Sequence, residues 1–326
     1  MNATAHAAAP SDASPRLVLK IVSPPPSPAA SSTPAVPSPA FLERWLKPGF
    51  RKIGEWMVRG DVGWTLVGTH LTRFGLFLAS ERAAADRDEI VRRHPALADA
   101  LSHERVLNGP FEDLDYTGVA SCCSAHYPKL LGTYEAELHP FLNALSERDF
   151  DGVINVGSAE GYYAVGLATR FPSWRVVAYD ADEKARSQIK RLAIQNGVAD
   201  RIEIRGRCGP SDLGNLPFRR ALVVMDCEGA EETLLRADNI RRLAQSTLII
   251  ETHDGYLPGI TRRIADLLAG SHVVHVVDAV HDADRSEKLG QPDVLHELSR
   301  REANCVMAEN RIHACLRWLV AQPKRV

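Results

Sequence analysis

Short apolar runs alternate with longer segments of helical periodicity from residue 150 onward. The runs that this pattern predicts as strands are GVINV (152–156), RVVAY (175–179), RIEIR (201–205), ALVVM (221–225), TLIIET (247–252), HVVHVV (272–277) and LRWLVA (316–321). Helices are expected between most of them, over 161–170, 182–196, 230–243 and 257–269. Apolar strands that alternate with helices are typical of a parallel sheet covered on both faces. The pattern therefore predicts an α/β fold for this half of the chain.

The first half of the chain has a different pattern. Alanine, serine and proline dominate residues 1–40, so we expect a disordered tail in which only RLVLKIV (16–22) could pair as a strand. A helical pattern begins near residue 41, and we expect an N-terminal helical lead-in or cap over 41–125, followed by the α/β domain over 126–326. The second helical region of the lead-in (80–101) should be interrupted at Pro95.

The first helical region of the lead-in, FLERWLKPGFRKIGEWMVRG (41–60), is amphipathic. Aromatic and aliphatic side chains recur on one face, and arginine and lysine side chains recur on the other. This pattern is found in helices that lie on a membrane surface. It is also found in helices that cover a protein body and keep a basic face in water, and we favour this second interpretation.

A strand, a glycine loop and a helix are predicted in VINVGSAEGYYAVGLATRF (153–171). Gly157 allows a tight turn after the strand, and Gly161 opens the helix at a point where a side chain would collide. Asp180 ends the next predicted strand, where an acid can accept hydrogen bonds from ribose hydroxyls. Ala159 stands where a dinucleotide site needs glycine for the approach of the pyrophosphate, and the loop is not of the P-loop type. The loop therefore favours a ligand with a ribose and no phosphate, such as S-adenosylmethionine.

Several stretches resemble a known family. INVGSAEGYYAVGLA and VVAYDAD are similar to motifs one and two of class I S-adenosylmethionine-dependent methyltransferases. VVMDCEGAEETLL (223–235) closely resembles the fourth-strand signature of the FkbM-type methyltransferases, and LIIETHD (248–254) and LGTYEAEL (131–138) resemble two further elements of that family. The resemblance covers about 130–280. It implies a Rossmann-like class I methyltransferase fold, with a mostly parallel seven-stranded sheet and helices on both faces, and an O-methyltransferase activity.

The resemblance also implies which residues meet S-adenosylmethionine. The expected contacts come from the loop, the strand ends and the element before the first strand: Tyr134, Asn155, Gly157, Ser158, Ala159, Gly161, Asp180, Cys208 and Asp226. Glu135 is expected beside Tyr134 as part of a cap on the cofactor pocket. The sequence departs from the family at Asn155, where an aspartate is usual, and at Arg207, where many methyltransferases carry an acid that meets the adenine. Cys208 and its neighbours are therefore the expected adenine contact.

The acceptor hydroxyl needs a base or a metal ion, because an alcohol holds its proton tightly near neutral pH. Asp226 ends the fourth predicted strand, and Glu251 and His253 end the fifth. We expect His253 to be the base, because imidazole titrates near working pH, with Asp226 or Glu251 orienting it. In the alternative, which we do not favour, a divalent ion such as Mg²⁺ binds four side chains: Asp226, Glu228, Glu251 and His253. Glu231 and Glu232 are expected only to complement a helix dipole.

Composition limits the remaining choices. The 326 residues carry a formal net charge of −2 and a pI of about 6.6, so no overall basic field exists to hold a nucleic acid. No apolar run is long enough to span a bilayer, no signal peptide is evident, and the six cysteines form no CxxC pair, so we expect reduced thiols in a cytoplasmic protein. The sequence thus predicts an enzyme that methylates a hydroxyl of a small molecule or a sugar. A non-catalytic binding protein that keeps the methyltransferase fold is the alternative, and a nicotinamide-dependent dehydrogenase is disfavoured by Ala159.

Overall fold

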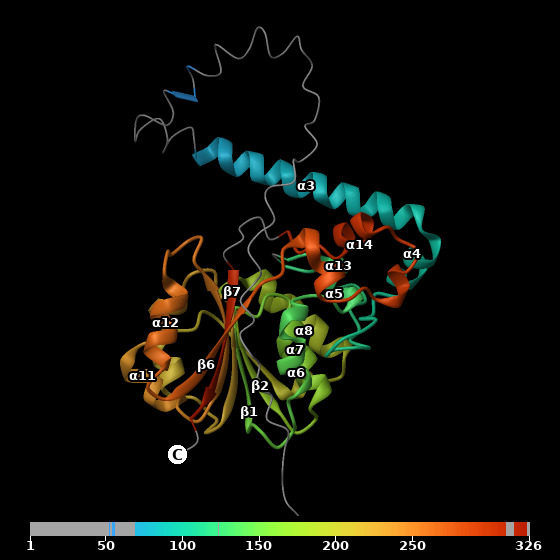
Figure 1. The fold of residues 1–326 in the computed structure, drawn as a ribbon. Helices are drawn as coiled ribbons and strands as arrows, with labels where there is room; N and C mark the ends of the chain where they lie inside the picture. The colour runs from blue at the N-terminus through green and yellow to red at the C-terminus, as the bar shows by residue number, and fades with distance from the viewer. Residues whose placement is uncertain (1–51, 53, 56–68, 123, 311–315, 325–326) are drawn as a thin grey trace, which may run out of the picture. The chain divides into compact units, whose positions relative to one another are not determined.

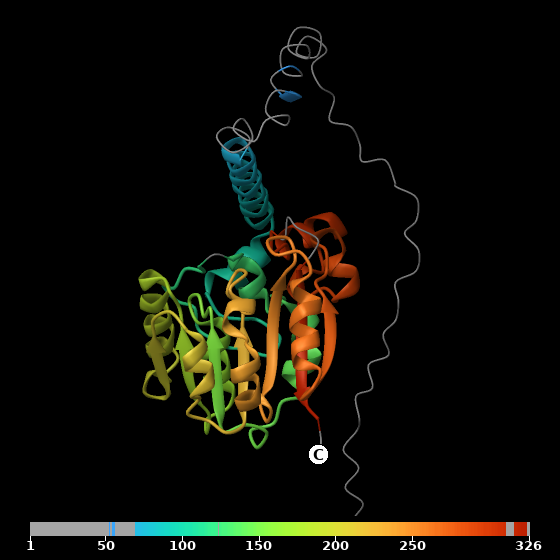
Figure 2. The same ribbon diagram turned by 90° about the vertical axis from the view of Figure 1, so that its left-hand side faces the viewer.

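Seven strands build one sheet in this computed structural model, in the order β3-β2-β1-β4-β5-β7-β6 (Figures 1 and 2). The strands are β1 (Gly152–Val156), β2 (Arg175–Tyr179), β3 (Ile202–Arg205), β4 (Ala221–Met225), β5 (Thr247–His253), β6 (His272–Asp278) and β7 (Leu316–Pro323). The first five pair in parallel, and β7 runs antiparallel between β5 and β6. The predicted Rossmann-like fold, with its mostly parallel seven-stranded sheet and helices on both faces, is confirmed.

The structure describes residues 52, 54–55, 69–122, 124–310 and 316–324. The predicted tail over 1–40 lies outside these residues, as does nearly all of the predicted amphipathic helix over 41–60. Contacts between Cα atoms divide the chain into one unit over Met1–Thr72 and a second over Arg73–Val326, which holds the sheet. The predicted start of the α/β domain at residue 126 stays a prediction.

Helices cover both faces of the sheet. α7 (Tyr162–Arg170) and α8 (Glu183–Gln195) lie on one face, and α11 (Ala237–Leu243) and α12 (Ile260–Leu268) lie on the other (Figure 1). Successive strand residues point to opposite faces, so Val153 of β1 joins the hydrophobic core with α7, whereas its neighbour Ile154 joins the core with α11 and α12. Because both faces are covered, every residue of β1 and β4 is buried.

One predicted helix is divided in the structure. The pattern predicted a helical segment over 230–243, and the structure forms it as two helices, α10 (Glu231–Leu234) and α11. The side chain of Asn239 accepts a hydrogen bond from Arg236 N at 3.0 Å and donates one to Leu234 O at 2.7 Å. These bonds satisfy backbone groups that a continuous helix would have paired internally, and they fix the break.

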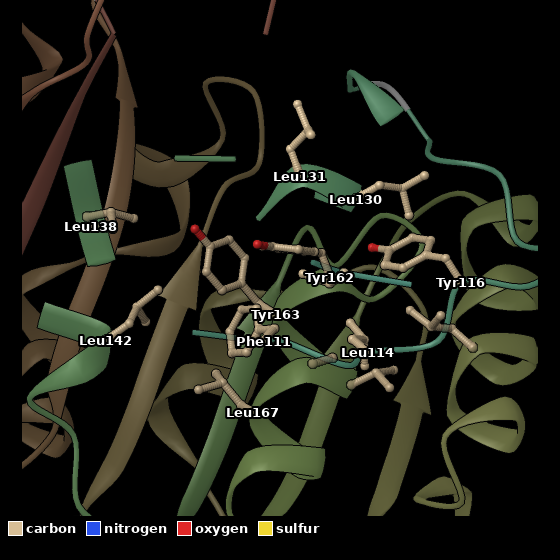
Figure 3. Close-up of a cluster of buried hydrophobic side chains, with 14 of the residues drawn as sticks. Phe111, Leu114, Tyr116, Leu130, Leu131, Leu138, Leu142, Tyr162, Tyr163 and Leu167 are labelled. Atoms are coloured by element: carbon tan, nitrogen blue, oxygen red, sulfur yellow. The ribbon is translucent and has the colours of Figure 1, made fainter. Parts of the chain in front are cut away.

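In the structure we use the name lead-in for all described residues from 69 to the start of β1, which extends it past the predicted boundary at 125. Side chains of the lead-in pack on the face of the sheet that α7 covers. Its helical elements are α3 (Thr69–Arg93), α4 (Pro95–Ser102), α5 (His126–Leu131), η2 (Ala136–Leu138) and α6 (His139–Asn143). Pro95 starts α4 directly after α3, so the predicted interruption is confirmed. Side chains of the lead-in and of α7 form one buried cluster, which Figure 3 shows: Phe111, Leu114, Tyr116, Leu130, Leu131, Leu138, Leu142, Tyr162, Tyr163 and Leu167.

An insertion between β6 and β7 packs against the lead-in. It contains η4 (Asp282–Asp284), α13 (Arg285–Lys288), η5 (Asp293–Leu295) and α14 (Arg300–Val306), and Figure 1 shows α14 beside α4. Arg93 donates to Glu302 Oε1 at 3.0 Å, and Arg87 donates to Asn310 Oδ1 at 2.7 Å.

Two further short elements, η3 (Ala199–Arg201) and α9 (Pro210–Gly214), flank β3. Within the described ranges, no helix has both the length and the apolar content needed to cross a bilayer.

Candidate functional site

A cavity of about 890 Å³ lies at the carboxyl ends of β1, β2, β4 and β5. Open parallel sheets hold their ligands at this edge. The cavity is lined by nearly all of the predicted site residues: Tyr134, Asn155, Gly157, Ser158, Ala159, Asp180, Cys208, Asp226, Glu228, Glu251 and His253. Gly161 is not a lining residue; it precedes α7, and a Cβ there would meet the side chains of Val165 and Ile189 at 3.1 and 3.4 Å. The structure thus brings the predicted residues together, while their roles stay predictions.

The loop after β1 has a conformation that demands small residues. Gly157 has φ 73°, and a Cβ on it would lie 1.6 Å from the carbonyl oxygen of Asp226. Ala159 also has a positive φ, of 48°, and its N–H donates to Asp180 Oδ2 at 2.8 Å. The other carboxylate oxygen of Asp180 accepts the N–H of Asp182 at 2.8 Å. Asp180 therefore fixes the loop, and because each carboxylate oxygen has two lone pairs, it can still accept hydrogen bonds from a ribose.

Two buried oxygen atoms in the cavity wall lack hydrogen-bond donors. Asn155 donates from Nδ2 to Val224 O at 3.3 Å, but its Oδ1 has no partner among the described residues. The same is true of Asp226 Oδ1. A buried acceptor without a donor costs free energy. Both residues line the cavity, so these oxygens are candidate acceptors for a donor group of a ligand.

Three carboxyl groups crowd one part of the same wall. One carboxylate oxygen from each of Glu135, Asp226 and Glu251 lies within 4.8 Å of the others. Burial raises the pKa of Asp226 well above its usual value, and the negative charges of Glu251, Glu135 and Glu228 raise it further. Carboxylates this close cannot all be ionised without a compensating positive charge. The wall is therefore suited to a proton or to a cationic group of a ligand.

His253 pairs with a carboxylate that we had assigned only to a helix dipole. Its Nδ1 lies 3.1 Å from Glu231 Oε1, and Glu231 is fully buried. The same oxygen accepts the backbone N–H groups of Cys227 and Gly229, both at 3.2 Å. The expected roles need correction here, because Glu231 and not Asp226 or Glu251 holds the imidazole. The turn that follows β4 fixes Glu231, and Glu231 in turn fixes the ring.

The second nitrogen of His253, Nε2, faces the carboxylates of the cavity. Three of their oxygens surround it beyond good hydrogen-bond distance: Glu228 Oε2 at 3.5 Å, Asp226 Oδ1 at 3.6 Å and Glu251 Oε2 at 3.8 Å. Burial alone would lower the pKa of His253, but the hydrogen bond to Glu231 and the surrounding negative charges outweigh it and raise that pKa. Tyr256 stacks on the ring, with centroids 5.8 Å apart and an interplanar angle of 16°. Nε2 is therefore a basic nitrogen with room for a substrate proton.

The donors around His253 also suit a divalent ion. Oxygen ligands and one imidazole are a familiar set for such ions. The carboxylate oxygens of Glu228, Asp226 and Glu251 lie 3.5 to 3.8 Å from Nε2, so these side chains would have to close in on an ion as small as Mg²⁺, whose neighbouring ligands are about 3 Å apart. A histidine that binds a metal usually donates its other N–H to a carboxylate, as His253 does to Glu231. The four residues predicted as alternative metal ligands thus lie together.

A buried ion pair behind the loop was missed by the sequence analysis. Glu160 lies within the loop, is fully buried, and pairs with the equally buried Lys129 of α5. Glu160 also accepts the hydroxyl of Tyr116 at 3.0 Å and the N–H of Cys122 at 2.9 Å. Lys129 Nζ lies 4.7 Å from the centre of the Tyr134 ring, which lines the cavity. The signal available in the sequence was a single lysine inside the apolar run YPKLLG.

Cys208 lies where β3 leads into α9, and it lines the cavity together with Arg207 and Gly209. Burial raises the pKa of the Cys208 thiol to about 12, so the side chain is neutral near pH 7. A neutral, soft side chain can pack against the face of a base. Cys208 as the adenine contact stays a prediction.

Comparisons with known proteins give only distant matches. No family model matches the chain, and no curated protein matches it. Among solved structures, it is similar to the O-methyltransferase TomG of Streptomyces achromogenes in complex with SAM, with 17% identity and TM-score 0.36 over 46% of this chain and 75% of that one. It is also similar to a putative O-methyltransferase from Klebsiella pneumoniae, with 11% identity and TM-score 0.40 over 60% and 82% of the two chains. A third similar structure is precorrin-6y C5,15-methyltransferase from Geobacter metallireducens, with 13% identity and TM-score 0.36 over 53% of this chain and 81% of that one. At such identities and TM-scores, the activity has to be argued from the site itself.

Proposed function

We propose that this chain is an FkbM-type S-adenosylmethionine-dependent methyltransferase that methylates a hydroxyl of a small molecule or a sugar. The observation that carries the proposal is the cluster of carboxyl groups of Glu135, Asp226 and Glu251, the first and last of them buried, in the same cavity as the Gly157 loop. S-adenosylmethionine has a positive ammonium group and a positive sulfonium, whereas a dinucleotide has a negative pyrophosphate. The carboxyl groups attract the first ligand and repel the second.

The residues present fit this cofactor. Asp180 would accept hydrogen bonds from its ribose, as its position after β2 suggests. The unpartnered oxygens of Asn155 and Asp226 would accept from its ammonium group. The family usually has an aspartate at the position of Asn155, and Glu135 and Glu251, which line the same cavity, would supply the negative charge that is missing there. The departure at Asn155 therefore does not remove the negative field that the cofactor needs.

His253 is the proposed base for the acceptor hydroxyl. When bound, the cofactor would supply a methyl group on a positively charged sulfur. His253 Nε2 would accept the proton of the acceptor hydroxyl and so make the acceptor oxygen a better nucleophile. Glu231 keeps the other proton on Nδ1, so that Nε2 is the free base, and its charge stabilises the imidazolium that forms. Burial keeps water from competing for the methyl group.

The cofactor's charge and the basicity of His253 are coupled. The raised pKa of His253 makes Nε2 a stronger base, but it also leaves more of the ring protonated at neutral pH. Part of that rise comes from the charge of Glu251, which the proposed cofactor would neutralise. Binding a cation beside Glu251 therefore lowers the pKa of His253. The fraction of free base then increases when the methyl donor is in place.

A metal-assisted transfer is the second candidate for the same reaction. It is favoured by the carboxylate oxygens around His253 Nε2 and by the Glu231 hydrogen bond behind the ring. Asp226, Glu228, Glu251 and His253 would hold the ion. A divalent ion would lower the pKa of a bound hydroxyl and so replace a strong base.

Calorimetry on the full chain tests the cofactor assignment. We expect S-adenosylmethionine and S-adenosylhomocysteine to bind, and NAD to bind far more weakly. Asp226→Asn should weaken binding of S-adenosylmethionine, because it removes one of the charges that face the ammonium group. Asp266→Asn, an exposed change on α12, is the matched control and should have no effect. Tighter binding of NAD than of S-adenosylmethionine contradicts the proposal.

Transfer of labelled methyl groups to a panel of sugars and small alcohols then tests the reaction. It separates an enzyme from a non-catalytic binding protein.

A further inference from the structure

The first half of α3 exposes large apolar side chains. Four of them are between 50% and 57% exposed: Leu71, Phe74, Phe77 and Leu78. A helix turns by about 100° per residue, so these four side chains fall on one face about 120° wide. The second half of α3 is attached through different residues, since Ile90 and Val91 are buried in the core. The apolar face is therefore not used to hold the helix in place.

The amino-acid sequence just before α3 indicates what kind of surface this face meets. Three of the five tryptophans of the chain, Trp45, Trp56 and Trp64, fall between residues 41 and 68. The other two, Trp174 and Trp318, are fully buried in the core. Between residues 41 and 60, five basic residues outnumber two acidic ones. Tryptophan together with an excess of lysine and arginine is typical of segments that lie in the interface of a bilayer.

We propose that the apolar face of α3 docks on the surface of an anionic lipid bilayer. The excess of positive charge in residues 41–60 favours an anionic lipid surface over a second copy of the chain as the binding partner. A second copy of the chain would bring the same excess of positive charge against itself, whereas anionic headgroups attract it. The interpretation of the predicted helix over 41–60, nearly all of which lies outside the described residues, stays a prediction.

Vesicle sedimentation of the full chain tests the docking. Large vesicles of phosphatidylcholine mixed with phosphatidylglycerol should bind the protein at least about tenfold more tightly than vesicles of phosphatidylcholine alone, and salt should weaken the binding. The double variant Phe74→Glu/Phe77→Glu should lower the partition coefficient by about tenfold or more, because two half-buried rings are lost from the interface. Ile194→Glu is the matched control: Ile194 is 61% exposed on α8, outside the proposed face, and its change should leave binding as it is.

Three results would overturn the inference. These are equal binding to neutral and anionic vesicles, undiminished binding of the double variant, and equal losses for the double variant and Ile194→Glu. Light scattering separates the rival occupant, because a wild-type dimer that the double variant dissociates, without vesicle binding, would make this face a subunit interface. The melting temperature and the binding of S-adenosylmethionine should be the same in all variants. The vesicle assay needs no cofactor, so its outcome is independent of the proposed methyltransferase activity.

Discussion

Glu231→Gln should slow methyl transfer without weakening cofactor binding. Glutamine has the size of glutamate, and its carbonyl oxygen can still accept the N–H groups of Cys227, Gly229 and His253 Nδ1 that Glu231 Oε1 accepts now. The substitution therefore removes one negative charge and leaves the turn after β4 satisfied. Alanine would be a poorer test, because it would leave buried donors without partners and could unfold the turn.

The size of the effect follows from the hydrogen bond to the ring. A hydrogen bond to a charged group contributes about 1.5–3 kcal/mol, against about 0.5–1.5 kcal/mol for a neutral one. Glu231 faces the imidazolium that forms as the acceptor loses its proton, so the difference is lost mainly in the transition state. A loss of about 1–1.5 kcal/mol corresponds to a fall in kcat of about 5- to 15-fold. Because Glu231 contributes to the raised pKa of His253, removing its charge lowers that pKa. The acidic limb of the pH profile of kcat/KM should then move to lower pH.

Steady-state kinetics across pH, with calorimetry for the cofactor, measures both parts. Glu232→Gln is the control: it is the adjacent acid, exposed and paired with Arg263, and it should leave the pH profile unchanged. A merely structural role for Glu231 would lower the melting temperature and the active fraction but would not move the pH limb. Full kcat with an unmoved limb in Glu231→Gln would refute the assignment of Glu231 as the residue that positions His253.

Three further results are expected. The raised pKa of Asp226 favours its protonated form in the free protein, so binding of a cationic cofactor should release protons. The affinity for the cofactor should therefore rise as pH increases from acid. Calorimetry in buffers of different ionisation enthalpy should detect the proton release, and identical heats in all buffers would count against it. Asp180→Ala should weaken cofactor binding by about 1–3 kcal/mol through lost hydrogen bonds to the ribose and the loop, and unchanged calorimetric affinity would remove Asp180 from the site. His253→Ala should lower turnover by about a hundredfold or more at unchanged cofactor affinity. Loss of wild-type activity in a chelator, with recovery in Mg²⁺ or Mn²⁺, would favour the metal-assisted candidate. Full turnover of His253→Ala together with full wild-type turnover in the chelator would show that the side chains around His253 have only a structural role.

The sheet could be predicted from the sequence because its central strands are buried on both faces. β1, β2 and β4 begin and end at the predicted residues, since an apolar run bounded by polar positions leaves little choice of length. The place of β7 between β5 and β6 could not be predicted in this way, because strand order is not encoded in the apolar run itself. The insertion over η4 to α14 was missed because its helices are too short for a periodic pattern.

The cavity could be predicted because parallel strands end at the same edge of a sheet. Residues at four strand ends, among them Asp180, Asp226 and His253, were therefore expected together and are found together. Glu231 could not be placed, because an acid in the first turn of a helix usually faces water, and only the turn after β4 directs it into the core. The ion pair between Glu160 and Lys129 could not be predicted either, because it depends on a contact between segments that are distant in the sequence.

Two buried ion pairs join the cofactor loop and the cavity wall to segments that the family resemblance does not cover. Glu160 of the loop pairs with Lys129 of the lead-in, and Glu309 of the insertion pairs with Arg285 while it also accepts the N–H of Glu135. Removing one partner of such a pair leaves an uncompensated buried charge, which costs about 3–5 kcal/mol. The loop and the carboxyl cluster therefore hold their positions only while the lead-in and the insertion are docked. A substitution in either segment that removes one of these partners is therefore expected to disturb the cavity wall as well.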